Sequence, residues 1–400
     1  MPGPSPIWAR PFAIAAIVPL RGAFPATDVP LMSHLFTPLR IRDLEFRNRV
    51  FVSPMCQYSS PDGRPSDWHV VHLGSRAVGG AGLVLTEATA VSPEGRISPD
   101  DTGIWTDAQA AAWRRVTDFV RGQGAAVGIQ LAHAGRKAST PAPWQGDKAL
   151  GPGERGWQPI APSAVAFSEA SPVPSAMSEG DIDRVVGEFA EAARRSLGAG
   201  FQVVEVHAAH GYLLHQFLSP LANRRTDEYG GSLENRMRVP LEVFRAVRAA
   251  FPPDRPVWAR LSATDWVDGG WDLDSSVAFA RALEEAGSAA IHVSTGGVSP
   301  QQKIAPGAGY QVPFAARIKA EVGLPTIAVG LITEPEQAET IVASGEADAV
   351  ALARAMLFDP RWPWHAAAKL GAKVRAPKQY WRSQPREYKD LFEGAAVGQR

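Results

Sequence analysis

Cysteine is almost absent from this chain: Cys56 is the only one among 400 residues. A single thiol cannot build an intrachain disulfide framework, nor supply the several thiolates of a structural zinc or iron–sulfur site. The formal net charge is zero, so the composition predicts no broad attraction to nucleic acid or to an acidic membrane. Apolar stretches of membrane-spanning length are also missing. We therefore expect a globular, cytoplasmic protein that binds neither nucleic acid nor membrane.

Residues 1–31 differ from the rest in composition. They are rich in proline, carry no acidic residue before Asp28, and hold one short apolar run at 11–20. We expect a disordered N-terminal extension here, with a targeting peptide as the alternative. The main domain is expected at 32–374, followed by a C-terminal surface arm at 375–400.

A repeating order of short apolar strand, polar loop and amphipathic helix fills the main domain. Strands are predicted at 50–54, 82–88, 126–131, 202–207, 257–262, 289–294, 325–329 and 347–353. Helices are predicted at 68–79, 107–123, 179–198, 233–251, 274–286, 313–322, 335–344 and 361–370. This alternation is typical of an α/β protein with a (β/α)₈ TIM barrel. A doubly wound sheet, the alternative, would need a Gly-x-Gly-x-x-Gly turn after an early strand, and no predicted early strand is followed by one.

Two further segments decorate the predicted barrel. Residues 35–49 alternate like a short hairpin lid before the first strand. Residues 132–177, after the third strand, are rich in Pro, Gly and Ser and too long for an ordinary connection. We expect this second segment to be a functional excursion over the barrel mouth.

The strand predicted at 202–207 leads into three polar rings, His207, His210 and Tyr212. Imidazoles can donate hydrogen bonds to an oxygen that gathers negative charge, and a phenol can release a proton. In a barrel the chemistry gathers at the carboxyl ends of the strands, so these rings predict a site that reduces a polarised double bond. A metal pair would need further ligands, and no carboxylate or cysteine nearby in the sequence completes such a set. We expect no metal.

Glycines and an arginine follow the last three predicted strands, at 296–297, Gly330 and Arg354. Such turns, together with a guanidinium, form the customary phosphate pocket of this fold. Gln130, at the end of the third strand, suits the edge of a pyrimidine-like ring, and Arg260, on the fifth, can neutralise an anionic heterocycle. With the histidines opposite, these features predict a flavin mononucleotide (FMN) site.

Two charged features lie near the predicted site, and for the first of them, Glu205, we expect no catalytic role. Glu205, within a strand, is expected to pair with an inward cation such as Arg260. Arg136 and Lys137 either attract the phosphate of NADPH or form a solvated pair on a loop.

Four motifs carry a resemblance to a known family. They are Val-Ser-Pro-Met-Cys-Gln-Tyr at 52–58, Ile-Gln-Leu-Ala-His-Ala-Gly-Arg-Lys at 129–137, His-Ala-Ala-His-Gly-Tyr-Leu-Leu-His-Gln-Phe-Leu-Ser-Pro at 207–220 and Asn-Arg-Arg-Thr-Asp-Glu-Tyr-Gly-Gly-Ser-Leu-Glu-Asn-Arg at 223–236. With them the chain resembles the Old Yellow Enzyme family of flavin-dependent ene-reductases, especially its thermophilic-like class, which includes xenobiotic reductases. The likeness runs from about residue 33 to 383.

The resemblance implies roles for individual residues. Tyr212 matches the proton donor, and His207 and His210 match the pair that binds the substrate's carbonyl or nitro oxygen. Tyr58 resembles an active-site tyrosine that contacts substrate. Arg382 looks like an arginine that enters the neighbouring protomer's site, which implies a homodimer or homotetramer.

The cofactor is expected to be held by residues from seven strand ends. Among them Cys56 looks like the cysteine that touches the flavin, while Ala353 stands where the family often has glycine. The expected contacts are Ser53, Pro54, Met55, Cys56, Ala88, Gln130, Arg260, Gly297, Gly330, Ala353 and Arg354.

Residues and resemblance together predict an NADPH dehydrogenase, or ene-reductase, with bound FMN and with NADPH or NADH as co-substrate. It is expected to reduce activated C=C bonds of α,β-unsaturated carbonyl or nitro compounds by a ping-pong hydride transfer. Two alternatives stay open at this point. One is a phosphate-binding barrel lyase or isomerase without flavin, and the other is a flavin-based redox sensor that uses Cys56.

Overall fold

The computed structural model describes residues 33–146 and 148–395. The extension predicted at 1–31 lies outside the described residues. Within them, no helix combines the length and the apolarity that crossing a membrane requires.

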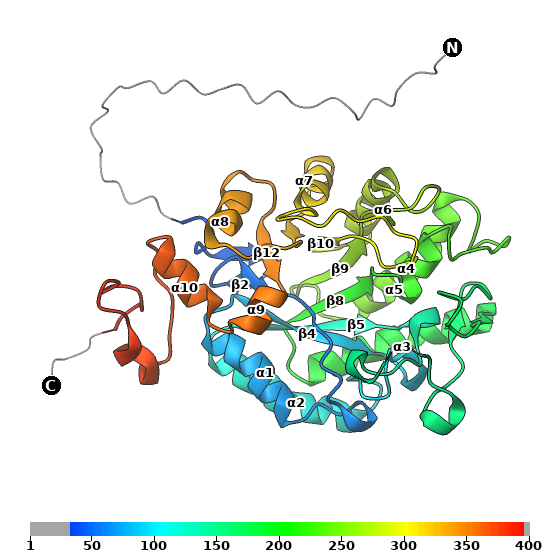
Figure 1. The fold of residues 1–400 in the computed structure, drawn as a ribbon, viewed down its shortest axis with the longest axis horizontal. Helices are drawn as coiled ribbons and strands as arrows, with labels where there is room; N and C mark the ends of the chain where they lie inside the picture. Colours follow the sequence, from blue (N-terminus) through cyan, green and yellow to red (C-terminus); the bar gives the residue numbers. More distant parts are fainter. Residues whose placement is uncertain (1–32, 147, 396–400) are drawn as a thin grey trace, which may run out of the picture. The chain divides into compact units, whose positions relative to one another are not determined.

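Eight parallel strands close into a barrel in the order β3-β4-β5-β8-β9-β10-β11-β12, and Figure 1 shows them in the centre with helices around them. Every residue of these strands is buried. Strands covered on both faces read as nearly continuous apolar runs, which is why the sequence predicts them well. Their bounds are Val50–Val52, Leu83–Ala90, Ala126–Ala132, Val203–Ala208, Val257–Ser262, Ile291–Ser294, Thr326–Ala328 and Ala349–Leu352. The predicted TIM barrel is confirmed.

Helices follow the strands and cover the outside of the barrel (Figure 1). The eight predicted helices correspond to α1 Asp67–Val78, α2 Asp107–Gly122, α3 Glu179–Gly198, α5 Leu233–Ala250, α6 Leu273–Glu285, α7 Val312–Glu321, α8 Pro335–Ala343 and α10 Trp362–Lys369. Two short helices that the sequence did not predict are α4 Leu213–Leu218 and α9 Arg354–Phe358. Each has fewer than two turns, too few for a periodic pattern to show.

The predicted hairpin is present as β1 Leu39–Ile41 paired antiparallel with β2 Leu44–Phe46. Its buried residues belong to a second apolar cluster together with residues near the starts of the barrel strands, such as Leu83, Ala126 and Val203. The hairpin therefore packs across the amino-terminal end of the barrel, opposite the strand ends that carry the predicted site.

The described residues of the excursion at 132–177 form no long element. Its described residues form three 3₁₀ turns, η3 Gly135–Lys137, η4 Pro143–Gln145 and η5 Pro152–Glu154, and a two-residue parallel pair, β6 Ile160–Ala161 with β7 Ser175–Ala176. One further 3₁₀ turn, η1 Pro61–Gly63, follows β3, and another, η2 Pro93–Gly95, follows β4.

The described part of the C-terminal arm folds back on the barrel. Leu391 and Phe392 are buried in a small cluster with Trp364 of α10, and the Phe392 and Trp364 ring centroids lie 5.0 Å apart. An isolated bridge joins Val374 to Phe392. The sequence predicts only a surface arm here and not this buried anchor, because two apolar residues separated from the barrel by a polar stretch give no periodic signal.

Candidate active site

Three rings meet where β8 ends. The His207 ring centroid lies 5.1 Å from that of His210 and 5.1 Å from that of Tyr212. Burial, with the positive charge of Arg260 nearby, places the pKa of both histidines well below the usual value. Burial also raises the pKa of Tyr212 well above its usual value. The site therefore presents two neutral imidazoles and a phenol that keeps its proton.

The backbone of His210 is held in a left-handed conformation, with φ at +58°. Its N–H donates to Ser262 Oγ at 2.9 Å, and its carbonyl oxygen accepts from Lys137 Nζ at 2.9 Å. Gly297 packs directly on this backbone: a Cβ there would lie 2.5 Å from the Cα of His210, and its φ is +98°. Only glycine fits so close an approach at this φ. Backbone packing alone therefore accounts for glycine at position 297, without the cofactor contact that the resemblance implies.

Arg136 and Lys137 do not form a solvated pair on a loop, which was one of the two alternatives expected for them. Arg136 is 4% exposed and donates to the Val298 carbonyl oxygen at 2.6 Å. Lys137 Nζ also donates to the Gly297 carbonyl oxygen at 3.0 Å and lies 4.9 Å from the Tyr212 ring centroid. Burial, and then the charge of Arg136, lower the pKa of Lys137 to about 8. Because a pKa of about 8 is still above 7, Lys137 is mostly protonated at neutral pH and adds a positive charge to the site.

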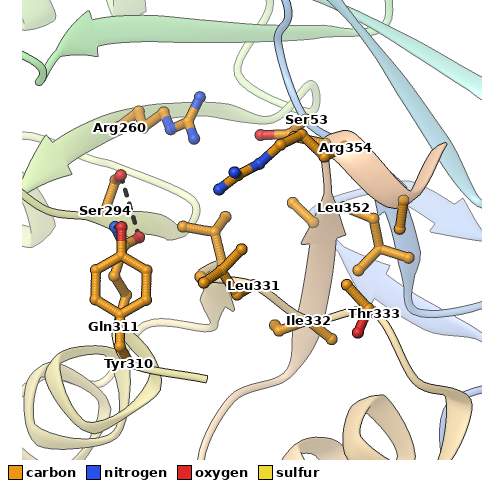
Figure 2. Close-up of a pocket in the computed structure, with 15 residues that line it drawn as sticks. Ser53, Arg260, Ser294, Tyr310, Gln311, Leu331, Ile332, Thr333, Leu352 and Arg354 are labelled. Atoms are coloured by element: carbon orange, nitrogen blue, oxygen red, sulfur yellow. Dashed lines mark hydrogen bonds between the residues drawn. The ribbon is translucent and has the colours of Figure 1, made fainter. Parts of the chain in front are cut away.

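A cavity of about 190 Å³ opens at the carboxyl ends of β10, β11, β12 and β3. Five of the expected cofactor residues line it, namely Ser53, Arg260, Gly330, Ala353 and Arg354. Figure 2 shows Arg260 and Arg354 reaching into the opening from opposite sides. In the described part of the chain neither arginine forms an ion pair, and Arg260 Nε and Ser53 Oγ are buried without a hydrogen-bond partner.

These groups fit FMN, since two guanidinium groups suit a phosphate and an electron-rich ring, and unpartnered donors need acceptors. A buried polar group without a partner is costly, so the protein alone does not satisfy this cavity. The strand ends at which phosphate binding is predicted therefore form a concave, cationic surface.

Glu205 lies below this cavity at the centre of the barrel and is fully buried. Its carboxylate accepts hydrogen bonds from Gln130 Nε2 at 2.7 Å and from Trp258 Nε1 at 2.7 Å, and it lies 2.6 Å from His292 Nδ1. The expected pairing with Arg260 was wrong: the contact is with His292, and since burial lowers the pKa of that ring, it is a hydrogen bond from a neutral imidazole, while Arg260 acts on Glu205 through charge at longer range. Gln130 is therefore oriented by a carboxylate.

The segment after β3 carries Pro54, Met55, Cys56 and Tyr58, all half-buried. Tyr58 has a left-handed φ of +50°. The segment is tied down by Glu87, which accepts from the Gln57 N–H at 2.9 Å.

Glu87 is held in turn by the buried His69, whose Nε2 lies 2.9 Å from its carboxylate. Burial raises the pKa of the Cys56 thiol well above its usual value. Ala88, also an expected contact, lines a small cavity shared with Tyr212.

Arg382 lies on η6 Lys378–Ser383 and is exposed. It does not line the cavity of this chain, so its entry into a neighbouring protomer's site stays a prediction.

Sequence reasoning gave no role to several residues that the structure places around the site. Ser262 and Ser294 end strands, a position that could have drawn attention to them. Tyr310 and Gln311 precede α7 in a loop and gave no signal.

Comparison with known proteins agrees with this geometry. Residues 34–372 match the model of the NADH:flavin oxidoreductase / NADH oxidase family. The chain is 46% identical over 350 residues to the NADPH dehydrogenase of Geobacillus thermodenitrificans, which covers 87% of this chain and 98% of that protein.

Two solved structures are similar as well. One is morphinone reductase, with 32% identity, a TM-score of 0.71, and coverage of 92% of this chain and 96% of that one. The other is an old yellow enzyme homologue from Zymomonas mobilis, with 28% identity and a TM-score of 0.71. This match covers 89% of this chain and 99% of that one.

Proposed function

Because this chain belongs to the NADH:flavin oxidoreductase / NADH oxidase family, we propose that it reduces activated C=C bonds, those conjugated to a carbonyl or nitro group. It is an FMN-dependent oxidoreductase that takes its electrons from NADPH or NADH, and it is related to the Old Yellow Enzymes. The observation that carries the proposal is the meeting of two neutral imidazoles and a protonated phenol at the end of β8.

Each of these rings has a task. His207 and His210 donate hydrogen bonds to the carbonyl or nitro oxygen of the substrate, which withdraws electrons from the β-carbon. Donors fixed in a site that excludes water stabilise such developing charge more strongly than water does. Tyr212 keeps its proton until the α-carbon accepts it, because burial raises its pKa.

The cavity residues have the task of holding the cofactor. Arg354 and Gly330 would bind its phosphate, while Arg260, Ser53 and Gln130 would contact its ring and adjoining chain. The chemistry that FMN supplies when bound is hydride transfer between NAD(P)H and the alkene.

The redox-sensor alternative needs a reactive thiolate. Burial raises the pKa of Cys56 instead, which favours a thiol that packs rather than one that reacts. The flavin-free lyase does not agree with the family to which the chain belongs.

Tyr212→Phe tests the proposal. The two half-reactions are measured separately by anaerobic stopped-flow absorption, first with NADPH and then with cyclohexenone. We expect alkene reduction to slow by about 10²–10⁴, the usual contribution of a general acid, while reduction of the bound flavin by NADPH stays nearly unchanged. Tyr229→Phe, a half-buried tyrosine outside the site, is the matched control. Equal losses in both half-reactions would remove Tyr212 from its role.

A further inference from the structure

A row of hydrogen bonds leads from His210 into the wall of the cofactor cavity. His210 Nε2 lies 2.8 Å from Ser294 Oγ, and Ser294 Oγ lies 3.3 Å from the side-chain amide of Gln311. The other end of this amide lies 2.6 Å from the Tyr310 hydroxyl. Ser294 and Gln311 are 3% and 5% exposed. Figure 2 shows the contact of Ser294 with Gln311, and Tyr310 beside it.

We propose that Tyr310, Gln311 and Ser294 form a relay of positioning residues that fixes the tautomer of His210, with the proton on Nδ1 and a lone pair on Nε2. The consequence drawn for substrate binding rests on the function proposed above. The tautomer itself does not depend on that function.

The imidazole of His210 is neutral. Burial, followed by the charges of Arg260, His207 and Lys137, lowers its pKa well below the usual value. A neutral imidazole carries its proton on one nitrogen only, and the partner of one nitrogen decides the state of the other. Ser294 is the partner of Nε2, so the Ser294 hydroxyl determines which ring nitrogen of His210 carries the proton.

The direction of the relay follows from its distances. The structure places the amide nitrogen of Gln311 toward Tyr310 and the amide oxygen toward Ser294. The two ends of an amide have nearly the same shape, so the hydrogen-bond network decides its orientation. A separation of 2.6 Å is typical of O–H···O and short for a nitrogen donor, whereas 3.3 Å is long for O–H···O. Both distances favour the amide turned over.

With that orientation every group in the relay has a consistent role. The Tyr310 hydroxyl donates to the amide oxygen of Gln311, and the amide N–H of Gln311 donates to Ser294 Oγ. The Ser294 hydroxyl is then free to donate to His210 Nε2. The proton of the ring therefore sits on Nδ1, which has no hydrogen-bond partner in the described part of the chain.

This tautomer gives His210 a donor for an incoming oxygen. The opposite tautomer would present a lone pair at Nδ1, which repels a carbonyl or nitro oxygen. The relay thus determines whether the second imidazole of the site attracts or repels the group that the first one binds. It also links the substrate side of the site to the cavity that Ser294 lines together with Arg260.

Nitrogen NMR of the full chain labelled with ¹⁵N-histidine tests the relay directly, in the absence of any turnover. The chain has nine histidines, and the His210 signals are assigned by their loss in His210→Asn. We expect a protonated Nδ1 and an unprotonated Nε2. In Ser294→Ala we expect both nitrogens to shift toward a mixture of tautomers, and in the milder Tyr310→Phe a smaller shift in the same direction.

A second measurement uses cyclohexenone as the probe, titrated into the oxidised holoenzyme and followed by the flavin absorption. We expect Ser294→Ala to weaken binding about tenfold, a loss of the size seen when a partner that orients a metal-bound histidine is removed. Thr295→Val is the matched control: this side chain is buried beside Ser294, and its hydroxyl has no partner among the described residues. It should leave the tautomer and the affinity unchanged.

A wild-type His210 protonated on Nε2, or a tautomer that both Ser294→Ala and Tyr310→Phe leave unaltered, would overturn the relay. These outcomes are distinct from a failure of the proposed function. A protein with the expected tautomer that does not reduce cyclohexenone would refute the function alone, and an active one with the other tautomer would refute the relay alone.

Discussion

Replacing Glu205 by glutamine keeps the shape of the side chain and removes its charge. The carboxylate accepts from Gln130 and Trp258 and binds His292, at 2.6–2.7 Å. An amide offers one oxygen and turns its nitrogen toward a donor, so at least one of these contacts becomes repulsive. A hydrogen bond to a buried charged group contributes about 1.5–3 kcal/mol, and a buried donor that is left without a partner costs about 1–3 kcal/mol more. We expect Glu205→Gln to lower the free energy of unfolding by about 3–5 kcal/mol.

The loss should depend on pH in a defined direction. Burial alone would raise the pKa of Glu205, but His292, Arg260 and the Trp258 N–H together lower it from 4.5 to about 2. A carboxyl whose pKa is lower in the folded state stabilises the fold above its unfolded value and loses that contribution as the pH falls toward the folded value. The difference between wild type and Glu205→Gln should therefore be full at pH 7 and shrink between about pH 4.5 and 2.

Urea unfolding of the holoenzyme, followed by fluorescence and circular dichroism at several pH values, measures this difference. Glu285→Gln, at the exposed end of α6, is the control and should leave the midpoint unchanged. A Glu205→Gln protein as stable as wild type at pH 7 would show that the carboxylate is not the ionised centre of this network.

Two further substitutions test the packing. Gly297→Ala should cost at least about 1–2 kcal/mol of stability and weaken cyclohexenone binding, because φ is +98° at this position and the new Cβ would press on the backbone of His210. Gly307→Ala is the control and should do neither, since its Cβ would meet nothing within 4 Å. Equal behaviour of the two variants would contradict the close approach. Phe392→Ala should free the C-terminal arm and speed its cleavage by trypsin at least severalfold. Phe358→Ala is the control and should not, because the Phe358 side chain is 94% exposed. An arm equally resistant to trypsin in both variants would mean that Phe392 does not anchor it.

The barrel could be predicted from the sequence because its signals are local. Each strand is buried on both faces and reads as an apolar run, and its position needs no knowledge of distant residues. The ends of strands could be read in the same way, so His207, Tyr212 and Arg260 were placed at the correct end of the barrel by topology alone.

What the sequence did not reveal are partnerships across the barrel. Glu205 and His292 are 87 residues apart, and Lys137 reaches the His210 carbonyl 73 residues away. Which of several buried charges meet depends on strand register and on loop paths, neither of which leaves a pattern in composition. The burial of Phe392 was missed for the same reason.

The hairpin β1–β2 gives the two ends of the barrel separate purposes. Its buried residues pack with residues near the starts of the barrel strands, so that end extends the apolar core, while the side chains at the carboxyl ends are available for chemistry. Changes in the hairpin should therefore alter how firmly the fold holds together, and changes at the opposite end should alter what the protein does.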